Sequence, residues 1–204
     1  MIELYDKADC TGCSACTNIC PRGCITMNAD SEGFLYPKVN TEMCVDCGLC
    51  EEVCPMLNKP LPHEIIAVYG AKNKDDSVRF ASSSGGMFTL FAEDVIKEDG
   101  VVVGAALDEN HTVKHCIVDS LDDLQKLRGS KYVQSIIGDT YAKIRSLLRS
   151  GKKVLFSGTP CQIAGLKRFL IKPFSNLITI DVVCHGVPSP KVYRKHLAEI
   201  EKTA

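Results

Sequence analysis

Apolar residues in the last two thirds of the chain follow two alternating patterns. Runs rich in β-branched residues predict buried strands at 65–71, 101–107, 154–156 and 177–183. Apolar residues at helical spacing predict helices at 87–97, 140–149, 160–170 and from Pro190 onward. Because strands alternate with helices, residues 65–204 are expected to form an α/β domain with a mixed, partly parallel sheet.

Residues 1–58 show a different pattern, with short apolar segments in place of long ones. Ile25–Met27 and Phe34–Tyr36 flank a turn rich in Asn, Asp and Gly, which predicts a β-hairpin. The segment 59–64 carries two prolines and is typical of an interdomain linker. We therefore expect a small N-terminal α+β module with little core of its own, then a linker, then the α/β domain.

Eight of the twelve cysteines form two runs of one spacing, C-x2-C-x2-C-x3-C-P, thirty-four residues apart. A 4Fe–4S cluster needs four thiolates arranged tetrahedrally around it, and three close cysteines on one loop supply three of them. In the bacterial two-cluster pattern, the fourth cysteine of each run binds the other cluster. The spacing therefore predicts a ferredoxin-like module with two ligand sets, which are Cys10, Cys13, Cys16 and Cys54 for one cluster and Cys20, Cys44, Cys47 and Cys50 for the other.

Zinc and disulfides are the two alternative uses of these cysteines. Structural zinc usually takes pairs of cysteines separated by a longer loop, and it does not require three in close succession followed by Cys-Pro. Disulfides would require a secreted chain, whereas the first residues show neither the charged leader nor the apolar stretch of a signal peptide. The repeated spacing therefore favours iron–sulfur clusters.

Composition and charge narrow the class of partner. The chain has 204 residues, of which 45% are apolar and 24% are charged, with a formal net charge of −1. A nucleic-acid-binding protein would usually show a basic excess, so no nucleic-acid partner is expected. No uninterrupted apolar stretch is long enough to span a bilayer. Together with cysteines that must stay reduced, these features predict a cytoplasmic protein without a membrane span.

Two further cysteines follow predicted strands of the α/β domain. Thr159 can cap the helix that begins at Pro160, which puts Cys161 in a first turn that favours a thiolate. Cys184 follows the next strand. If these strands are parallel neighbours, both cysteines lie where open α/β sheets place ligands, with Cα atoms within about 10 Å. The pair could hold a cluster, act as a redox dithiol or line a flavin pocket, whereas either cysteine alone could be a core residue.

Two loops carry residues suited to a phosphate or a flavin. Ser82–Gly86 precedes a predicted helix, and its small residues let backbone amides approach a phosphate closely. Gly129–Ser135 contains Lys131, whose ammonium group could pair with a phosphate or with flavin electron density. Taken alone, Ser82–Gly86 is better explained as a solvated loop, and Lys131 could also be solvated.

The remaining cysteines and four of the histidines are expected to have no role in the chemistry. Cys24 is expected to be a small buried residue, and Cys116 to serve packing alone. Residues expected at the surface are His63, His111, His115 and His196.

Four segments of the second domain together resemble the beta-subunit family of coenzyme F420 (deazaflavin) hydrogenases and dehydrogenases. They are Arg79–Gly86 (RFASSSGG), Gly129–Ser135 (GSKYVQS), Ser157–Gln162 (SGTPCQ) and Val183–Pro190 (VCHGVPSP). Each segment alone is a weak signal, but four in order are specific. The resemblance covers residues 65–204, with the ferredoxin-like module as an N-terminal fusion. Family members usually continue beyond the last motif, so the resemblance also implies a domain truncated at its C-terminus.

The resemblance implies a flavoprotein that binds FAD and passes electrons between iron–sulfur clusters and an acceptor. Its flavin site would include Ser83, Ser84, Gly85, Gly86, Ser130, Lys131 and Thr159. Cys161 and Cys184 would be ligands of a third 4Fe–4S cluster near the flavin, and together with Lys131 they are the candidate catalytic residues.

These features predict a subunit of an iron–sulfur flavoprotein oxidoreductase. FAD would convert between one-electron transfer by clusters and a two-electron hydride step. The acceptor would be a deazaflavin or another small molecule, and the redox partner a ferredoxin or a hydrogenase or dehydrogenase subunit. Two alternatives remain open, namely a non-catalytic ferredoxin-type electron carrier and a ferredoxin-linked thiol reductase that uses Cys161 and Cys184.

Overall fold

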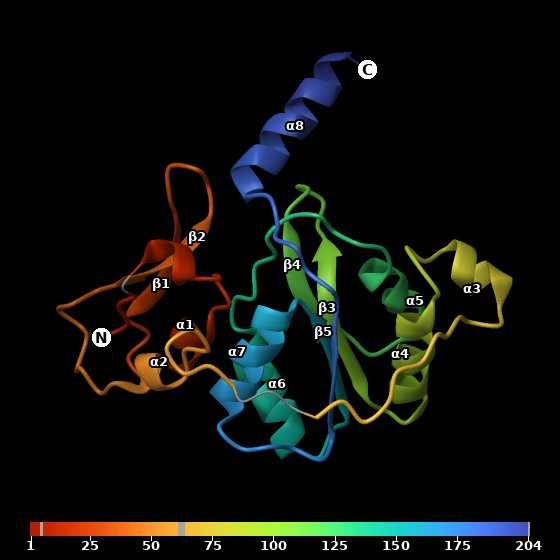
Figure 1. The fold of residues 1–204 in the computed structure, drawn as a ribbon, viewed down its shortest axis with the longest axis horizontal. Helices are drawn as coiled ribbons and strands as arrows, with labels where there is room; N and C mark the ends of the chain where they lie inside the picture. The colour runs from red at the N-terminus through yellow and green to blue at the C-terminus, as the bar shows by residue number, and fades with distance from the viewer. Residues whose placement is uncertain (5, 61–63, 204) are drawn as a thin grey trace.

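The computed structural model describes residues 1–4, 6–60 and 64–203 and contains two separate sheets (Figure 1). The smaller sheet is the predicted hairpin, in which β1 (Ile25–Ala29) pairs antiparallel with β2 (Leu35–Val39). The larger sheet has the order β4-β3-β5-β6. Its strands are β3 (Val101–Leu107), β4 (Val113–Val118), β5 (Val154–Gly158) and β6 (Leu177–Asp181). Because β3 pairs antiparallel with β4 but β5 is parallel to both β3 and β6, the predicted mixed sheet is confirmed.

Helices cover both faces of the larger sheet, and side chains of its strands alternate between the two faces. Within the N-terminal module lie η1 (Lys7–Asp9), α1 (Ala15–Ile19) and α2 (Leu49–Glu52). Beyond it lie α3 (Asp76–Phe80), α4 (Met87–Lys97), α5 (Leu121–Leu124), η2 (Gln125–Leu127), α6 (Thr140–Arg149), α7 (Pro160–Leu170) and α8 (Pro190–Thr203). Val103 and Phe156 pack with α6 and α7, whereas Val102 and Leu155 pack with α4, α5 and η2. The four predicted helices have the predicted bounds.

One apolar segment predicted as a strand lies outside the sheet, and another forms a strand shorter than predicted. Residues 65–71 form no strand, and Ile66 and Val68 are 99% and 86% exposed. The prediction of a strand there was wrong, because β-branched residues form a strand only where a sheet edge offers hydrogen bonds. Similarly, β6 ends at Asp181, two residues earlier than predicted. Of the linker predicted at 59–64, residues 61–63 lie outside the described residues.

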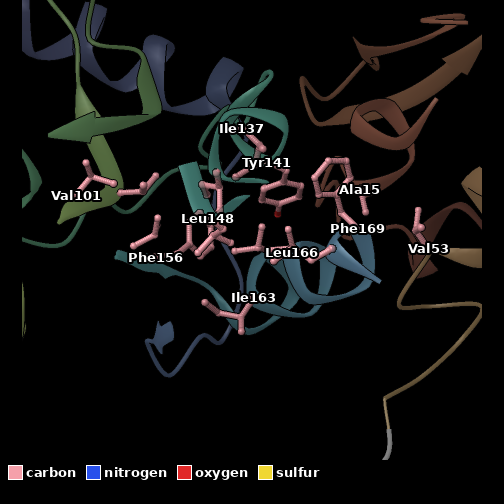
Figure 2. Packing of buried hydrophobic residues seen from close by; sticks show 14 residues of the cluster. Ala15, Val53, Val101, Ile137, Tyr141, Leu148, Phe156, Ile163, Leu166 and Phe169 are labelled. Atoms are coloured by element: carbon pink, nitrogen blue, oxygen red, sulfur yellow. The ribbon is translucent and has the colours of Figure 1, made fainter. Parts of the chain in front are cut away.

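The N-terminal module shares a hydrophobic core with the α/β domain. Ala15 of α1 is fully buried in the same cluster as Tyr141 of α6 and Phe169 of α7 (Figure 2). Asn18 reinforces this packing, because its amide donates to the carbonyl oxygen of Gly138 at 2.8 Å and accepts from the N–H of Ala142 at 3.3 Å. Helix α1 is thus held against α6 and α7 by both apolar and polar contacts.

The hairpin makes a second set of contacts with the α/β domain. The Gln134 side chain accepts from the N–H of Leu35 at 3.0 Å, and the Ser189 hydroxyl donates to the carbonyl oxygen of Glu32 at 2.6 Å. After Ser189, helix α8 extends away from the body of the molecule, and none of its described residues is buried (Figure 1).

Candidate functional site

The eight cysteines of the two runs line two cavities. The first cavity has about 360 Å³ of empty space, partly open to solvent, and its cysteines are Cys10, Cys13, Cys16 and Cys54. The second has about 350 Å³, and its cysteines are Cys20, Cys44, Cys47, Cys50 and Cys24. In each cavity the fourth cysteine of the other run joins three close cysteines. The structure therefore brings together the two groups of four that the spacing predicts, and it adds Cys24 to the second.

A cluster and a single metal ion require different arrangements of thiols. Among the described residues, no three His, Cys, Asp or Glu side chains converge on a point that one metal ion could occupy. A zinc site requires such convergence. In a 4Fe–4S cubane each thiolate binds a different iron atom, so the four sulfurs surround a cavity and do not meet. Each cavity, with cysteine thiols around it, therefore has the donors that a cubane cluster requires.

The two cysteine loops have the same backbone conformation. Gly12 and Ser14 are left-handed in the first loop, with φ of +66° and +63°, and Asp46 and Gly48 are left-handed at the equivalent positions of the second. Left-handed residues turn the chain tightly and direct backbone N–H groups into one concavity, an arrangement found at iron–sulfur sites. The repeat in sequence is thus a repeat in local structure.

Burial makes three thiols of the first cavity weaker acids than an exposed thiol. Burial raises the pKa of Cys13 and of Cys16 to about 12, and it also raises the pKa of Cys10. A cluster ligand must be a thiolate, so the positive charge of iron has to displace these protons. Loading of the first cavity is therefore expected to release protons.

Cys24 lines the second cavity, although the sequence predicts no role for it in the chemistry. It is buried, as predicted. Its sulfur is 3.4 Å from that of Cys20, and this contact raises the pKa of Cys24 to about 11. Cys24 therefore keeps its proton and can donate it toward the sulfur of a predicted ligand. The four-residue separation from Cys20 was the only sequence signal for this contact.

Cys161 lies beside the first cavity. Thr159 caps α7, its N–H donates to the Gln162 side chain at 3.0 Å, and its hydroxyl lies 3.1 Å from the Cys161 sulfur. Burial raises the pKa of Cys13, and the nearby Cys161 adds to that increase. The start of α7 is thus turned toward the N-terminal module.

Cys184 lies in a different environment. The predicted parallel pairing of β5 with β6 is confirmed, with Gly158 opposite Asp181. Cys184 is exposed beyond β6, where its sulfur accepts the N–H of Gly186 at 3.4 Å. None of the contacts between described residues joins Cys161 to Cys184, so the closeness of this pair stays a prediction.

The two loops predicted to bind flavin lie together. The backbone N–H of Ser130 donates to the Ser83 hydroxyl at 2.8 Å, and Ser83 and Ser84 are exposed. Gly85 permits the close approach of another segment, because a Cβ there would lie 2.8 Å from the carbonyl oxygen of Ala71. Gly86 is left-handed, with φ of +73°, and precedes α4.

The ammonium group of Lys131 is bound to the backbone in this structure. It donates to the carbonyl oxygens of Arg128 at 2.7 Å and of Lys126 at 3.1 Å. Burial lowers the pKa of Lys131. In this conformation Lys131 therefore caps the end of η2.

A buried polar network joins two of the motifs, and it centres on a histidine predicted at the surface. His115 is buried and stacks on Phe156, with ring centroids 5.3 Å apart. The prediction was wrong because β4 turns His115 inward with Val113, two residues away. The other predicted surface histidines, His111 and His196, are exposed, and His63 lies outside the described residues.

The network fixes the tautomer of His115. Its Nε2 lies 3.2 Å from the carbonyl oxygen of Ser157, which can only accept, so Nε2 carries the proton. Its Nδ1 then accepts from the Ser135 hydroxyl at 3.2 Å, and that oxygen accepts from the Gln162 amide at 2.8 Å. Ser135 and Gln162, which end the GSKYVQS and SGTPCQ motifs, are therefore partners.

Comparison with known protein families identifies the class of the chain. Residues 9–57 match the 4Fe-4S dicluster domain. Residues 68–138 and 151–203 match the N-terminal and C-terminal parts of the coenzyme F420 hydrogenase/dehydrogenase beta subunit. The chain belongs to this beta-subunit family and carries a dicluster domain at its N-terminal end.

Several curated proteins and solved structures are similar to the chain. It is 26% identical over 172 residues to a subunit of the F(420)H(2) dehydrogenase of Methanosarcina mazei, covering 78% of this chain and 48% of that protein. It is 29% identical over 199 residues to the coenzyme F420-dependent sulfite reductase of Methanocaldococcus jannaschii, covering 91% of this chain and 29% of that protein. The chain thus spans about half or less of the length of these two relatives.

A chain of the F420-reducing NiFe hydrogenase complex from Methanosarcina barkeri has a similar fold. The TM-score is 0.51 with 19% identity, over 62% of this chain and 46% of that chain. In the part of the chain that the structure describes, no helix combines the length and apolar character needed to cross a bilayer.

The buried histidine gives a testable pH dependence. Burial lowers the pKa of His115 to about 4, below its ordinary value of 6.5. Between these values the unfolded chain binds the proton and the folded chain does not, so the free energy of unfolding falls as the pH drops from 6.5 to 4. His115 should account for about 3 kcal/mol of this loss.

We expect the His115→Gln variant to lose less stability over this pH range in urea unfolding, because glutamine does not titrate. The exposed His196 provides the matched control, and His196→Gln should keep the wild-type pH dependence. Equal pH dependence in the wild type and His115→Gln would show that His115 is not held neutral in the folded protein.

Proposed function

We propose that this chain is a subunit of an iron–sulfur flavoprotein oxidoreductase that relays electrons between two 4Fe–4S clusters and FAD. The observation that carries the proposal is the gathering of eight cysteines around two cavities. The match to a dicluster domain and to a hydrogenase/dehydrogenase beta subunit supports the same chemistry. The names of the relatives support an oxidoreductase class.

The clusters would be held in the crossed arrangement. Cys10, Cys13, Cys16 and Cys54 would bind one cluster in the first cavity, and Cys20, Cys44, Cys47 and Cys50 would bind the other in the second cavity. Bound clusters supply one-electron transfer. The protein supplies the concave loops and the buried thiols that bind them.

The α/β domain would bind FAD at the loops that the Ser83–Ser130 hydrogen bond joins. Ser84, Gly85 and Gly86 lie next to the start of α4, where free backbone N–H groups favour a phosphate. The remaining predicted flavin-site residues are Lys131 and Thr159. Bound FAD supplies the conversion between one-electron and two-electron chemistry.

A third cluster and an external acceptor would complete the relay. Cys161 and Cys184 would be ligands of that cluster in a longer protein. The acceptor would be a deazaflavin or another two-electron acceptor, and the redox partner a ferredoxin or a hydrogenase or dehydrogenase subunit. Support for a deazaflavin comes from the names of the two relatives.

Pairs of cysteine variants test the crossed arrangement. Anaerobically reconstituted wild-type protein should hold about eight iron atoms per chain, and a single Cys→Ala variant about four. Cys20→Ala and Cys47→Ala should share one electron paramagnetic resonance (EPR) spectrum of the surviving cluster, because both lose the second site. Cys54→Ala and Cys13→Ala should share a second, different spectrum, because both lose the first site. If the spectrum of Cys20→Ala matched that of Cys13→Ala, each run would bind its own cluster.

The flavin site is tested by the Ser83→Ala variant. It removes the hydrogen bond that joins the two loops. FAD binding must then order the loops without it, and an added cost of about 1 kcal/mol weakens FAD binding roughly fivefold. The matched control is Ser146→Ala, because Ser146 is exposed on α6. Iron content should stay unchanged in both variants. Unchanged FAD affinity in Ser83→Ala would contradict the assignment of this loop.

A further inference from the structure

A glycine inside α7 touches a predicted cluster ligand. Gly165 is buried in the helix, and a Cβ built on it would lie 3.1 Å from both the Cβ and the sulfur of Cys13 and 3.3 Å from the Tyr141 hydroxyl. These distances are shorter than the roughly 3.5 Å of ordinary carbon contacts. Glycine in a helix interior costs about 1 kcal/mol relative to alanine. The close approach of Cys13 gives a physical reason for glycine at this position.

Cys161 extends this contact along α7. It precedes Gly165 by four residues, so both lie on the same side of the helix. The Tyr141 hydroxyl, which is close to Gly165, donates to the carbonyl oxygen of Gln162 at 2.9 Å and fixes α6 against the same turn. The first half of α7 therefore forms a wall behind the first cavity.

The second cavity has no such wall among the described residues. Both cavities are lined by the N-terminal module, but the apolar cluster behind the cysteines of the second contains only residues of that module, whereas Cys13 of the first packs against residues of α6 and α7. Cys47 is exposed, and Val45 on its rim is 61% exposed. The cavity therefore lies at the surface of the module, with an apolar residue beside it.

We infer that the two cluster sites have different positions in the relay. The first cavity is the inner site, which exchanges electrons with the α/β domain across the wall made by Gly165 and Cys161. The second cavity is the outer site, where a protein carrying a one-electron redox group docks. Each transfer between the sites moves one electron, so one cluster is oxidised as the other is reduced, and no bond forms or breaks. This inference rests on the function proposed above.

The Gly165→Ala variant tests the wall. Alanine favours the helix, so the fold should persist, but the added methyl group pushes on Cys13. We expect the EPR signal of the first cluster to change while that of the second keeps its wild-type line shape. Gly165→Leu should lose the first cluster and about half of the iron. The matched control is Gly70→Ala, because nothing described lies within 4 Å of a Cβ at that exposed position.

A second measurement tests which of the two cluster sites lies closer to solvent. Cys47→Ala should retain only the first cluster, and Cys13→Ala only the second. A water-soluble chromium chelate should speed the electron-spin relaxation of the second cluster several-fold more than that of the first, because relaxation depends on how closely the chelate approaches.

The outcomes separate this inference from the proposed function. If wild-type protein bound no iron–sulfur cluster after reconstitution, the proposed function would fail, and the inference with it. If it bound two clusters but Gly165→Ala changed neither signal or only the second, the inference alone would fail. Equal or reversed effects of the chelate would also overturn it.

Discussion

The packing of α1 against α6 and α7 is the contact on which the arrangement of the molecule depends. Ala15 and Gly165 are small enough for the backbones to approach, and Tyr141 lies beneath them. The Tyr141 ring contacts Phe156 and Phe169, with centroids 5.9 Å and 6.0 Å apart. A larger residue at this junction would separate the first cysteine cavity from the α/β domain. The same close packing therefore serves both stability and the proposed relay.

The buried network around His115 gives two of the chain's motifs a structural role that needs no cofactor. The Gln162 side chain donates a hydrogen bond to the Ser135 hydroxyl and accepts one from the N–H of Thr159. A buried polar group that lost its partner would cost about 1–3 kcal/mol. These two residues thus hold the loop before α6 and the start of α7 in place, and Thr159 and Cys161 depend on that support.

Local regularities made much of the structure predictable. The helix bounds followed from apolar spacing, and the two groups of four cysteines followed from the two-cluster spacing, in which the fourth cysteine of each run binds the other cluster. The strand predicted at Ile65–Ala71 does not form, because the apolar character of a segment does not show whether a sheet edge is available to it. His115 could have been found by its alternation with Val113 and Ile117 on β4. The contact of Gly165 with Cys13 joins residues far apart in sequence, and its only local signal was a glycine inside a helix.

Locating the iron atoms in the reconstituted protein by anomalous diffraction would test the account most directly. The account predicts two groups of four iron atoms, one in each cavity, with the group bound by Cys13 lying closer to α7. Cys54 should bind in the same group as Cys13, and Cys20 in the other. Single iron or zinc ions in place of the two groups, or a group bound by Cys20 lying closer to α7, would contradict it.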